Sequence, residues 1–509
     1  GLVAAAYLLK AGLDVCVIES YDKCGGGAIT EELTLPGFKH DSHSFYHSLL
    51  QVNPLISQDE LGLKSKYGLK YINYDPGEAF IFPDDRALIQ YQDIDKTCES
   101  IAQFSERDAE AYRRFIKAAG EMRRILVEFM FSPPPTFGNM ISFLEASEVG
   151  REYLRIIMGS PLDLAEDWFE SDEIRAACIR SAAETITLPQ QQGTGQKAFV
   201  FSSGAFEIAI PEGGSGALSE ALIACIRDNG GVIKISSPVK AIKIEAGEAK
   251  GVVLDTGEEI MATKAVVSSI NVKQLFLEML KPDELPAGFQ EKVKRIKQKA
   301  YIVMPIDFAL NEAPRYKAGG DVNKTAFVRI CPLVEGLLRM YEDISRGIPQ
   351  TGDVGVGTPT LVDPTRAPEG KHILFFWLHE PADLKEGGLS RWNEIKEQIA
   401  DGALETLRKH TTNLGPENIL GRSIRSPLDL ERQNPAWPGG HAGHIGDNLS
   451  QLFANRPLIG WGHYRTPVKK LYMCGASTHP SSGINGGSRA AMPIIMEDLG
   501  IDFKKVIAK

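Results

Sequence analysis

The sequence predicts an α/β fold that contains a Rossmann-like nucleotide-binding unit. Near its start, an apolar helix runs directly from Gly1, and a short apolar strand follows it and ends in the acid Glu19. A cluster of three glycines at 25–27 comes shortly after the strand. A helix that begins at glycine, followed by a strand that ends in an acid, is typical of the second half of a dinucleotide-binding βαβ unit.

The glycine fingerprint of such a unit is present only in part. A G-x-G-x-x-G turn lets the backbone approach a pyrophosphate, and the helix start adds partial positive charge. Gly1 fits the third glycine, and Glu19 follows at the distance expected of the acid that binds the ribose hydroxyls. The first strand and two glycines either precede this sequence or are absent from the domain. A helix and strand from an unrelated α/β protein are the alternative.

The glycines at 25–27 strengthen the nucleotide-binding interpretation. They follow the strand that ends at Glu19, and glycine permits both close backbone approach and positive φ. A flexible turn without a ligand is the alternative. We therefore expect Gly25, Gly26 and Gly27 to lie against a nucleotide.

The middle and the C-terminal end of the chain show the same alternation of helix and strand. The patterns predict a helix over 213–227, strands at 232–235, 239–244, 252–254, 265–269 and 471–474, and a helix over 488–499. The strand at 471–474 runs into Gly475 and a glycine-rich turn. The start of the following helix would offer free N–H groups and the positive end of its dipole to a ligand.

Two long inserts separate these blocks. The first is rich in helix, with a long amphipathic pattern over 102–131, and the second holds apolar strands at 301–308 and 372–378. Residues 129–131, followed by three prolines, are either an apolar lip facing an entry or a membrane, or a buried helix end and a loop.

The composition excludes several classes of protein. The chain has 509 residues, of which 43% are apolar and 24% charged, which suits a folded protein of two to four domain-sized units. Its net charge is −10, so we expect no nucleic acid as partner. The seven cysteines are scattered, which indicates reduced thiols and a cytoplasmic location, with peripheral membrane contact as an open possibility.

We expect neither a membrane span nor a metal site. No apolar run approaches the length of ~18 residues that a spanning helix needs. His40, His43 and His47 have a spacing that suggests metal ligands, but they follow a turn, and we interpret them as lining or core histidines. There is also no G-x-S-x-G motif, which argues against a serine hydrolase.

Several blocks together resemble a known family. They are residues 1–35, 36–41, 211–222, 438–444 and 471–486, in that order along the chain. In order and spacing they resemble the phytoene-desaturase-like FAD-dependent oxidoreductases, and within them the subgroup named after pyridine nucleotide-disulfide oxidoreductase domain-containing protein 2. The resemblance implies an amine-oxidase-like fold, with a Rossmann-like FAD-binding domain and a discontinuous substrate domain of mixed sheet plus helices.

The resemblance also implies domain boundaries and cofactor contacts. The FAD-binding domain would comprise 1–80, 196–275 and 425–509, and the substrate domain 81–195 and 276–424. The residues expected to bind FAD are Gly1, Glu19, Gly25, Gly26, Gly27, Val239, Gly475, Ala476, Gly483, Ile484 and Asn485.

The chemistry implied by the resemblance is removal of a hydride and a proton from a C–H bond of an apolar or alicyclic small molecule. Reduced flavin would then pass electrons to oxygen or a quinone. His441, His444 and His479 are candidates for accepting the proton, although each could instead orient the cofactor. A flavin-dependent polyene isomerase and a non-catalytic flavoprotein-like module are the alternatives.

Overall fold

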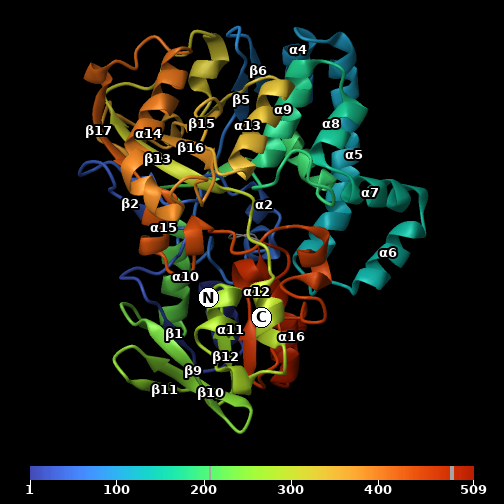
Figure 1. Cartoon of the computed structure of the whole chain (residues 1–509), viewed down its shortest axis with the longest axis vertical. Coiled ribbons are helices and arrows are strands. Elements are labelled where there is room, and N and C mark those ends of the chain that lie inside the picture. The colour runs from blue at the N-terminus through green and yellow to red at the C-terminus, as the bar shows by residue number, and fades with distance from the viewer. Residues whose placement is uncertain (206–207, 482–485, 509) are drawn as a thin grey trace.

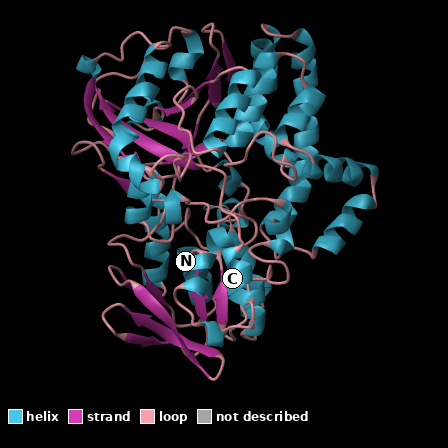
Figure 2. Ribbon diagram, viewed as in Figure 1, coloured by secondary structure: helices cyan, strands magenta, loops and turns pink. Residues whose placement is uncertain are grey.

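The computed structural model describes residues 1–205, 208–481 and 486–508, and Figure 1 shows that they form two halves. The upper half holds a large sheet and most of the long helices, as Figure 2 also shows. The lower half holds several short sheets and both chain termini. Strands and helices mix in both halves, which confirms the predicted α/β fold class.

The lower half is built on the elements that the glycine-rich blocks predict. Helix α1 (Leu2–Lys10) is followed by β1 (Cys16–Ile18), which pairs in parallel with β8 (Val232–Lys234). β12 (Val266–Ser268) pairs in parallel with β18 (Leu471–Met473). Helices α10 (Gly216–Asp228) and α16 (Gly487–Asp498) both pack against α1, whose small Ala4, Ala5 and Ala6 are buried in the contact.

A small antiparallel meander extends the lower half. It consists of β9 (Val239–Glu245), β10 (Glu248–Leu254) and β11 (Glu259–Met261). Two short helices, α11 (Val272–Leu277) and α12 (Phe289–Lys294), bury apolar side chains in the same core as the meander. Residues 276–296 therefore pack with the lower half, and we propose that the second insert begins after them and not at 276.

The upper half is organised by a seven-stranded sheet. Its strands, in spatial order, are β17 (Ile419–Ile424), β13 (Ile302–Leu310), β16 (His372–Glu380), β15 (Val354–Gly357), β14 (Phe327–Ile330), β5 (Glu78–Ile81) and β6 (Ala87–Gln90). Helix α14 (Trp392–Arg408) contributes to the core on one face. Side chains alternate along a strand, so the opposite face of β16 presents Phe375 and Trp377 to a separate cluster.

The first insert forms the helices beside this sheet. They are α4 (Ile94–Ala102), α5 (Glu106–Met130), α6 (Phe137–Glu145), α7 (Glu148–Met158), α8 (Pro161–Trp168) and α9 (Asp172–Ala183), joined by α13 (Val334–Ser345) from the second insert. Each of α4 to α9 begins with a Ser, Thr or Asp whose side chain accepts a hydrogen bond from a free backbone N–H.

Residues 129–131 lie at the end of α5, which favours the second of the two interpretations, a helix end followed by a loop. Phe131, just after α5, is buried, whereas the exposed aromatic side chains of this region are Phe137 and Phe143 on α6. Within 1–205, 208–481 and 486–508, no helix combines the length and the apolar character that a membrane crossing needs. Peripheral membrane contact stays a prediction.

Buried polar contacts join the two halves. Arg366 of the upper half lies 2.7 Å from Asp41, and Arg425, just after β17, donates to the hydroxyl and the carbonyl of Ser42 at 3.2 Å. The remaining short elements surround this junction or close the chain. They are β2 (Thr30–Glu31), β3 (His40–Asp41), α2 (Ser48–Gln51), α3 (Pro54–Ser57), β4 (Tyr71–Asn73), β7 (Ala209–Pro211), α15 (Pro427–Gln433) and α17 (Phe503–Ile507).

Candidate functional site

The start of α1 and the turn after β18 meet at one residue, Ser269. A Cβ built on Gly1 would lie 3.2 Å from Oγ of Ser269, and one built on Gly475 would lie 3.5 Å from its Cβ. Gly475 has φ of +80°, a conformation that favours glycine. Two glycine-bounded segments from opposite ends of the chain thus form one cradle with little room for side chains.

Glu19 directly follows β1, and it is the residue that the sequence predicts to bind a ribose. Its Oε1 accepts hydrogen bonds from the backbone N–H of Tyr21 at 3.0 Å and from Oγ of Ser20 at 3.3 Å. The backbone of Ser237 donates to the Glu19 carbonyl, which brings the start of β9, with Val239, close to the same strand end. Glu19 and the start of β9 therefore lie close together, and their contact with an adenosine stays a prediction.

The glycines at 25–27 close a tight turn against α10. A Cβ on Gly25, whose φ is +138°, would approach Oγ of Ser219 to 2.7 Å and the carbonyl oxygen of Ala28 to 2.8 Å. Gly27 faces His43 and the indole of Trp437. The turn therefore contacts the segment around Trp437, which precedes β18 and Gly475 in the chain.

A buried donor without a partner fits a ligand at the cradle. Nδ2 of Asn271 is fully buried, and no described residue accepts a hydrogen bond from it, although the side-chain oxygen caps α11. A buried unpaired amide costs stability unless something accepts from it. Gly483, Ile484 and Asn485, also predicted to bind FAD, lie outside the described residues, whereas the carbonyl of Ala476 accepts from Arg456 at 2.6 Å.

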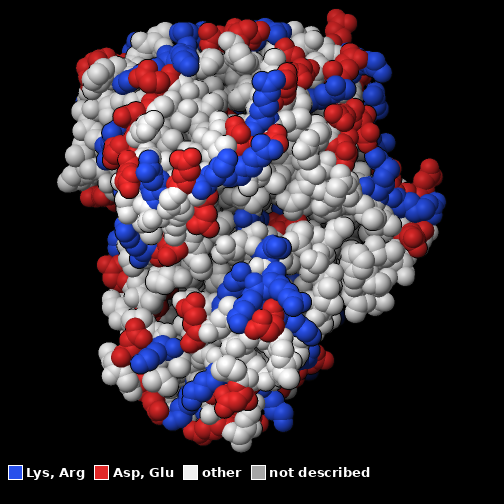
Figure 3. Space-filling view, viewed as in Figure 1, with Lys and Arg blue, Asp and Glu red and all other residues white. Residues whose placement is uncertain are grey.

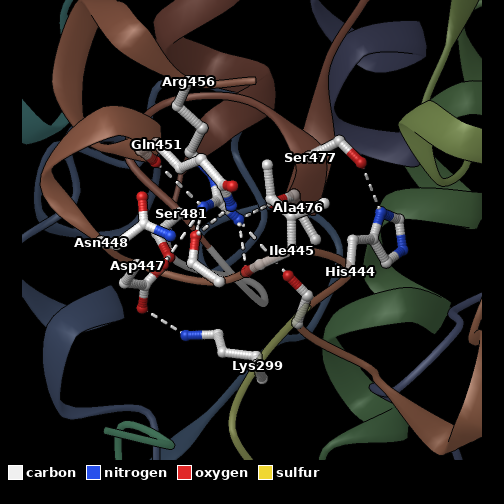
Figure 4. A network of polar contacts seen from close by, with 12 residues as sticks. Lys299, His444, Ile445, Asp447, Asn448, Gln451, Arg456, Ala476, Ser477 and Ser481 are labelled. Atoms are coloured by element: carbon white, nitrogen blue, oxygen red, sulfur yellow. Dashed lines mark hydrogen bonds and ion pairs between the residues drawn. The ribbon is translucent and has the colours of Figure 1, made fainter. Parts of the chain in front are cut away.

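A buried ionic network lies beside the C-terminal block and is drawn in Figure 4. Asp447 accepts from Lys299, from Lys197 at 2.6 Å and from Arg456 at 3.1 Å. Arg456 also donates to several carbonyl groups of this region, including those of Gly446 and Thr478. One carboxylate thus faces three basic side chains. Through Arg456, the network holds the loop around Gly446 and the turn at 476–478 in place.

Burial and the neighbouring charges act in opposite directions on the pKa values of Asp447 and Lys299. Burial would raise the pKa of Asp447, but Lys197, Lys299 and Arg456 together hold it well below its usual range. Burial lowers the pKa of Lys299 to about 7, and the attraction of Asp447 offsets this only in part. Lys299 is therefore a buried amine whose pKa lies well below that of an exposed lysine.

The three candidate histidines have different surroundings. Nδ1 of His444 lies 3.0 Å from Oγ of Ser477, and Nε2 of His479 lies 2.7 Å from the carbonyl oxygen of Phe129. Nδ1 of His441 is buried without a partner among the described residues. Burial, followed by Lys299 and Lys273, lowers the pKa of His441 to about 4, so its ring is neutral and a weak base at pH 7.

His40, His43 and His47 do not form a ligand set. His40 lies 3.5 Å from Asp307, His43 packs edge-on against Trp437, and His47 lies 3.0 Å from the hydroxyl of Tyr71. Among the described residues, no three metal-ligating side chains come together. These histidines support the junction of the two halves.

An aromatic wall, formed by Phe45, Tyr46, Phe327, Phe375 and Trp377, covers the sheet face opposite α14. Ring centroids lie 5.1 Å apart for Phe45 and Phe375 and 5.7 Å apart for Phe327 and Trp377. Tyr46 and Trp377 are only half-buried, so the wall is not closed on its free side. Such a surface suits an apolar molecule.

The aromatic wall and the ionic network are connected through one loop. Lys299 donates to the carbonyl of Thr185, and Tyr301 donates to that of Thr187 at 3.0 Å. Tyr301 in turn packs against His379, which stands on the same strand face as Trp377. Contacts through Thr185, Thr187 and Tyr301 therefore link Lys299 to the strand that carries Trp377.

A family model described as flavin containing amine oxidoreductase matches residues 1–492, which is nearly the whole chain. The chain belongs to the flavin-containing amine oxidoreductase family. Its cofactor is FAD, in agreement with the cradle and the unpaired amide of Asn271. The phytoene-desaturase-like resemblance and the predicted fold class are both confirmed.

Individual relatives place the chain within this family. A Rattus norvegicus protein, pyridine nucleotide-disulfide oxidoreductase domain-containing protein 2, is 29% identical, over 98% of this chain and 92% of its own length. A limonene dehydrogenase polypeptide of Castellaniella defragrans is 26% identical, over 99% and 93%. A putrescine oxidase variant shares the fold with a TM-score of 0.62, covering 98% and 96% at 16% identity.

Lys197, Lys299, Asp447 and Arg456 are absent from the residues predicted from the sequence. Lys197 and Asp447 stand 250 positions apart, so no local pattern connects them. The one available signal is that Lys299 directly precedes an apolar strand, where an uncompensated charge would be costly.

The buried histidines predict acid sensitivity. Burial is the first cause that lowers the pKa of His43, His47 and His444 to about 3 and of His441 and His479 to about 4. The unfolded chain takes up these protons below pH ~6.5 and the folded chain does not, so stability falls as the pH falls.

We expect the free energy of unfolding to drop by about 1 kcal/mol per histidine between pH 6.5 and 5.5. Urea unfolding of the holoprotein at several pH values measures this slope. His479→Gln can keep the hydrogen bond to Phe129 and should reduce the proton uptake on unfolding by about one. An unchanged uptake in this variant would show that His479 is protonated in the folded protein.

Proposed function

We propose that the chain is an FAD-dependent dehydrogenase or desaturase acting on a C–H bond of an apolar or alicyclic small molecule. One carbon loses a hydride, its neighbour loses a proton, and a carbon–carbon double bond forms. Bound FAD supplies the two-electron acceptor for the hydride. Oxygen or a quinone is the acceptor class that we propose for the electrons of the reduced cofactor.

The observation that carries the proposal is the charge of the site beside its aromatic wall. Lys197, Lys299 and Arg456 face a single carboxylate, that of Asp447, so the described site would repel a protonated amine. The aromatic wall offers an apolar surface instead. The name of the Castellaniella defragrans relative, a limonene dehydrogenase polypeptide, supports a hydrocarbon substrate for a related chain.

We propose that Lys299 holds or moves the proton. A proton-transferring group works best when its pKa lies near the working pH, and the pKa of Lys299 is about 7. Its Nζ is held by Asp447 and the carbonyl of Thr185. His441, His444 and His479 stay as predicted alternatives, with pKa values of about 3 to 4 that make them weaker proton acceptors.

The test is anaerobic reduction of the holoprotein by a panel of alicyclic hydrocarbons, cyclic ketones, polyenes and amines. We expect loss of the oxidised flavin absorbance with a hydrocarbon or ketone and no loss with an amine. Lys299→Gln should slow the reduction by about 10²–10⁴-fold and remove a pH inflection near 7. Isomerised product without loss of absorbance would identify an isomerase, and reduction by amines alone would contradict the proposal.

A further inference from the structure

The surface around α12 carries lysine and arginine side chains without an acidic partner in the described part of the chain, although the net charge of the whole chain is −10. The side chains of Lys281, Lys292, Arg295 and Lys297 are exposed, and none forms an ion pair with a described residue. In Figure 3 a group of blue side chains lies where Figure 1 labels α12, and the surface is hollowed above it, between the two halves. Glu278, Asp283 and Glu291 are exposed in the same segment, so its net charge is close to neutral.

Lys273 and Lys297 lie on either side of the loop 438–447, which contains His441 and His444. The N–H of Gly446 donates to the carbonyl of Lys297 at 2.8 Å, which places one side of the loop against Lys297. On the other side, the N–H of Val272 donates to Ser477, which also contacts His444, and Lys273 is the next residue. Lys273 is half-buried and forms no ion pair with a described residue.

The electrostatic influence of these groups on one another supports their closeness. Burial and then Lys297 lower the pKa of Lys273, while burial, Lys299 and Lys273 lower the pKa of His441. Like charges therefore oppose one another here. Asp447 does not relieve this, because it already pairs with Lys197, Lys299 and Arg456.

His441 supplies a buried group without a partner in the same place. It is 5% exposed, and its Nδ1 has no hydrogen-bond partner among the described residues. A buried polar atom left unpaired is costly, so a ligand atom that pairs with it is favoured. An anion would pair with His441 and at the same time compensate Lys273 and Lys297.

We propose that the substrate carries an anionic head group, a carboxylate or a phosphate, that binds between Lys273, Lys297 and His441. Its apolar skeleton then extends toward the aromatic wall. This inference rests on the proposed function and specifies its substrate class.

The experiment compares two probes that differ in charge and little in shape. The holoprotein is titrated with cyclohexanecarboxylate and with cyclohexanecarboxamide at low ionic strength, and binding is read from the change in the absorption spectrum of bound FAD. We expect the carboxylate to bind at least about tenfold more tightly and to weaken as salt is added. Inorganic phosphate that binds and displaces the carboxylate would assign a phosphate head group.

Lys273→Gln is the decisive variant, and Lys281→Gln is its matched control. Lys273→Gln should weaken carboxylate binding by about tenfold and leave carboxamide binding unchanged. Lys281→Gln removes an exposed unpaired lysine beyond the other end of α11 and should change neither. FAD content and far-UV circular dichroism of both variants establish that they are folded.

The outcomes separate this inference from the proposed function. Equal binding of carboxylate and carboxamide, no binding of any anion, or equal losses in the two variants would overturn the inference. Flavin reduction by neutral alicyclic compounds together with such results would leave the proposed function intact. Anion binding that depends on Lys273, without flavin reduction by the panel or by any alicyclic carboxylate that binds, would contradict the proposed function alone.

Discussion

Replacing Asp447 by asparagine is expected to lower the free energy of unfolding by about 3–5 kcal/mol. The carboxylate is the shared partner of Lys197, Lys299 and Arg456, of which Lys299 and Arg456 are almost completely buried. Removing one partner of a buried ion pair leaves an uncompensated charge in a medium that solvates it poorly. Chemical unfolding of wild type and Asp447→Asn holoprotein at pH 7.5 measures the difference.

The matched control is Asp228→Asn. Asp228 pairs with Lys66 at 2.6 Å, but both side chains are exposed to solvent. Water and salt screen such a pair, so its loss should have little effect on the unfolding midpoint. A similar midpoint for Asp447→Asn would mean that water reaches the network and that Asp447 does not hold it together.

The second large effect is expected from Gly25→Ala. Its φ of +138° is unfavourable for alanine, and the new methyl group would overlap Ser219 and the carbonyl of Ala28. The strain costs about 1–3 kcal/mol, and the turn must move away from α10 to relieve it. We therefore expect lower stability and a large loss of FAD affinity, measured by fluorescence titration with FAD.

Gly26→Ala separates the overlap from the effect of positive φ alone. Gly26 also has positive φ, of +59°, but a Cβ there would meet no atom within 4 Å. This variant should therefore lose less stability than Gly25→Ala. If the two variants lose the same stability, close packing against α10 is not what shapes the turn.

Patterns close together in the sequence are sufficient to predict the lower half. The helix after Gly1, the strand that ends before Glu19 and the strand before Gly475 all rest on apolar periodicity and adjacent glycines, and the structure contains each of them. Such signals are local, because hydrophobic spacing specifies which face of an element is buried.

The charged part of the site could not be predicted in this way. Asp447 pairs with residues 148 and 250 positions away, and only the folded chain brings them together. Composition is no guide either, because the net charge of the whole chain does not say where lysines such as Lys273 and Lys297 lie. The surroundings of His441 likewise depend on lysines from two other segments.

The central claim is that segments from both ends of the chain form one FAD-binding cradle. Titration of the cofactor-depleted protein with FAD, followed by the quenching of flavin fluorescence, tests it most directly. The account predicts saturation at about one FAD per chain and little competition from FMN, which lacks the adenosine that Glu19 and Val239 are predicted to contact. A folded protein that shows no saturable FAD binding, or that binds FMN equally well, would contradict it.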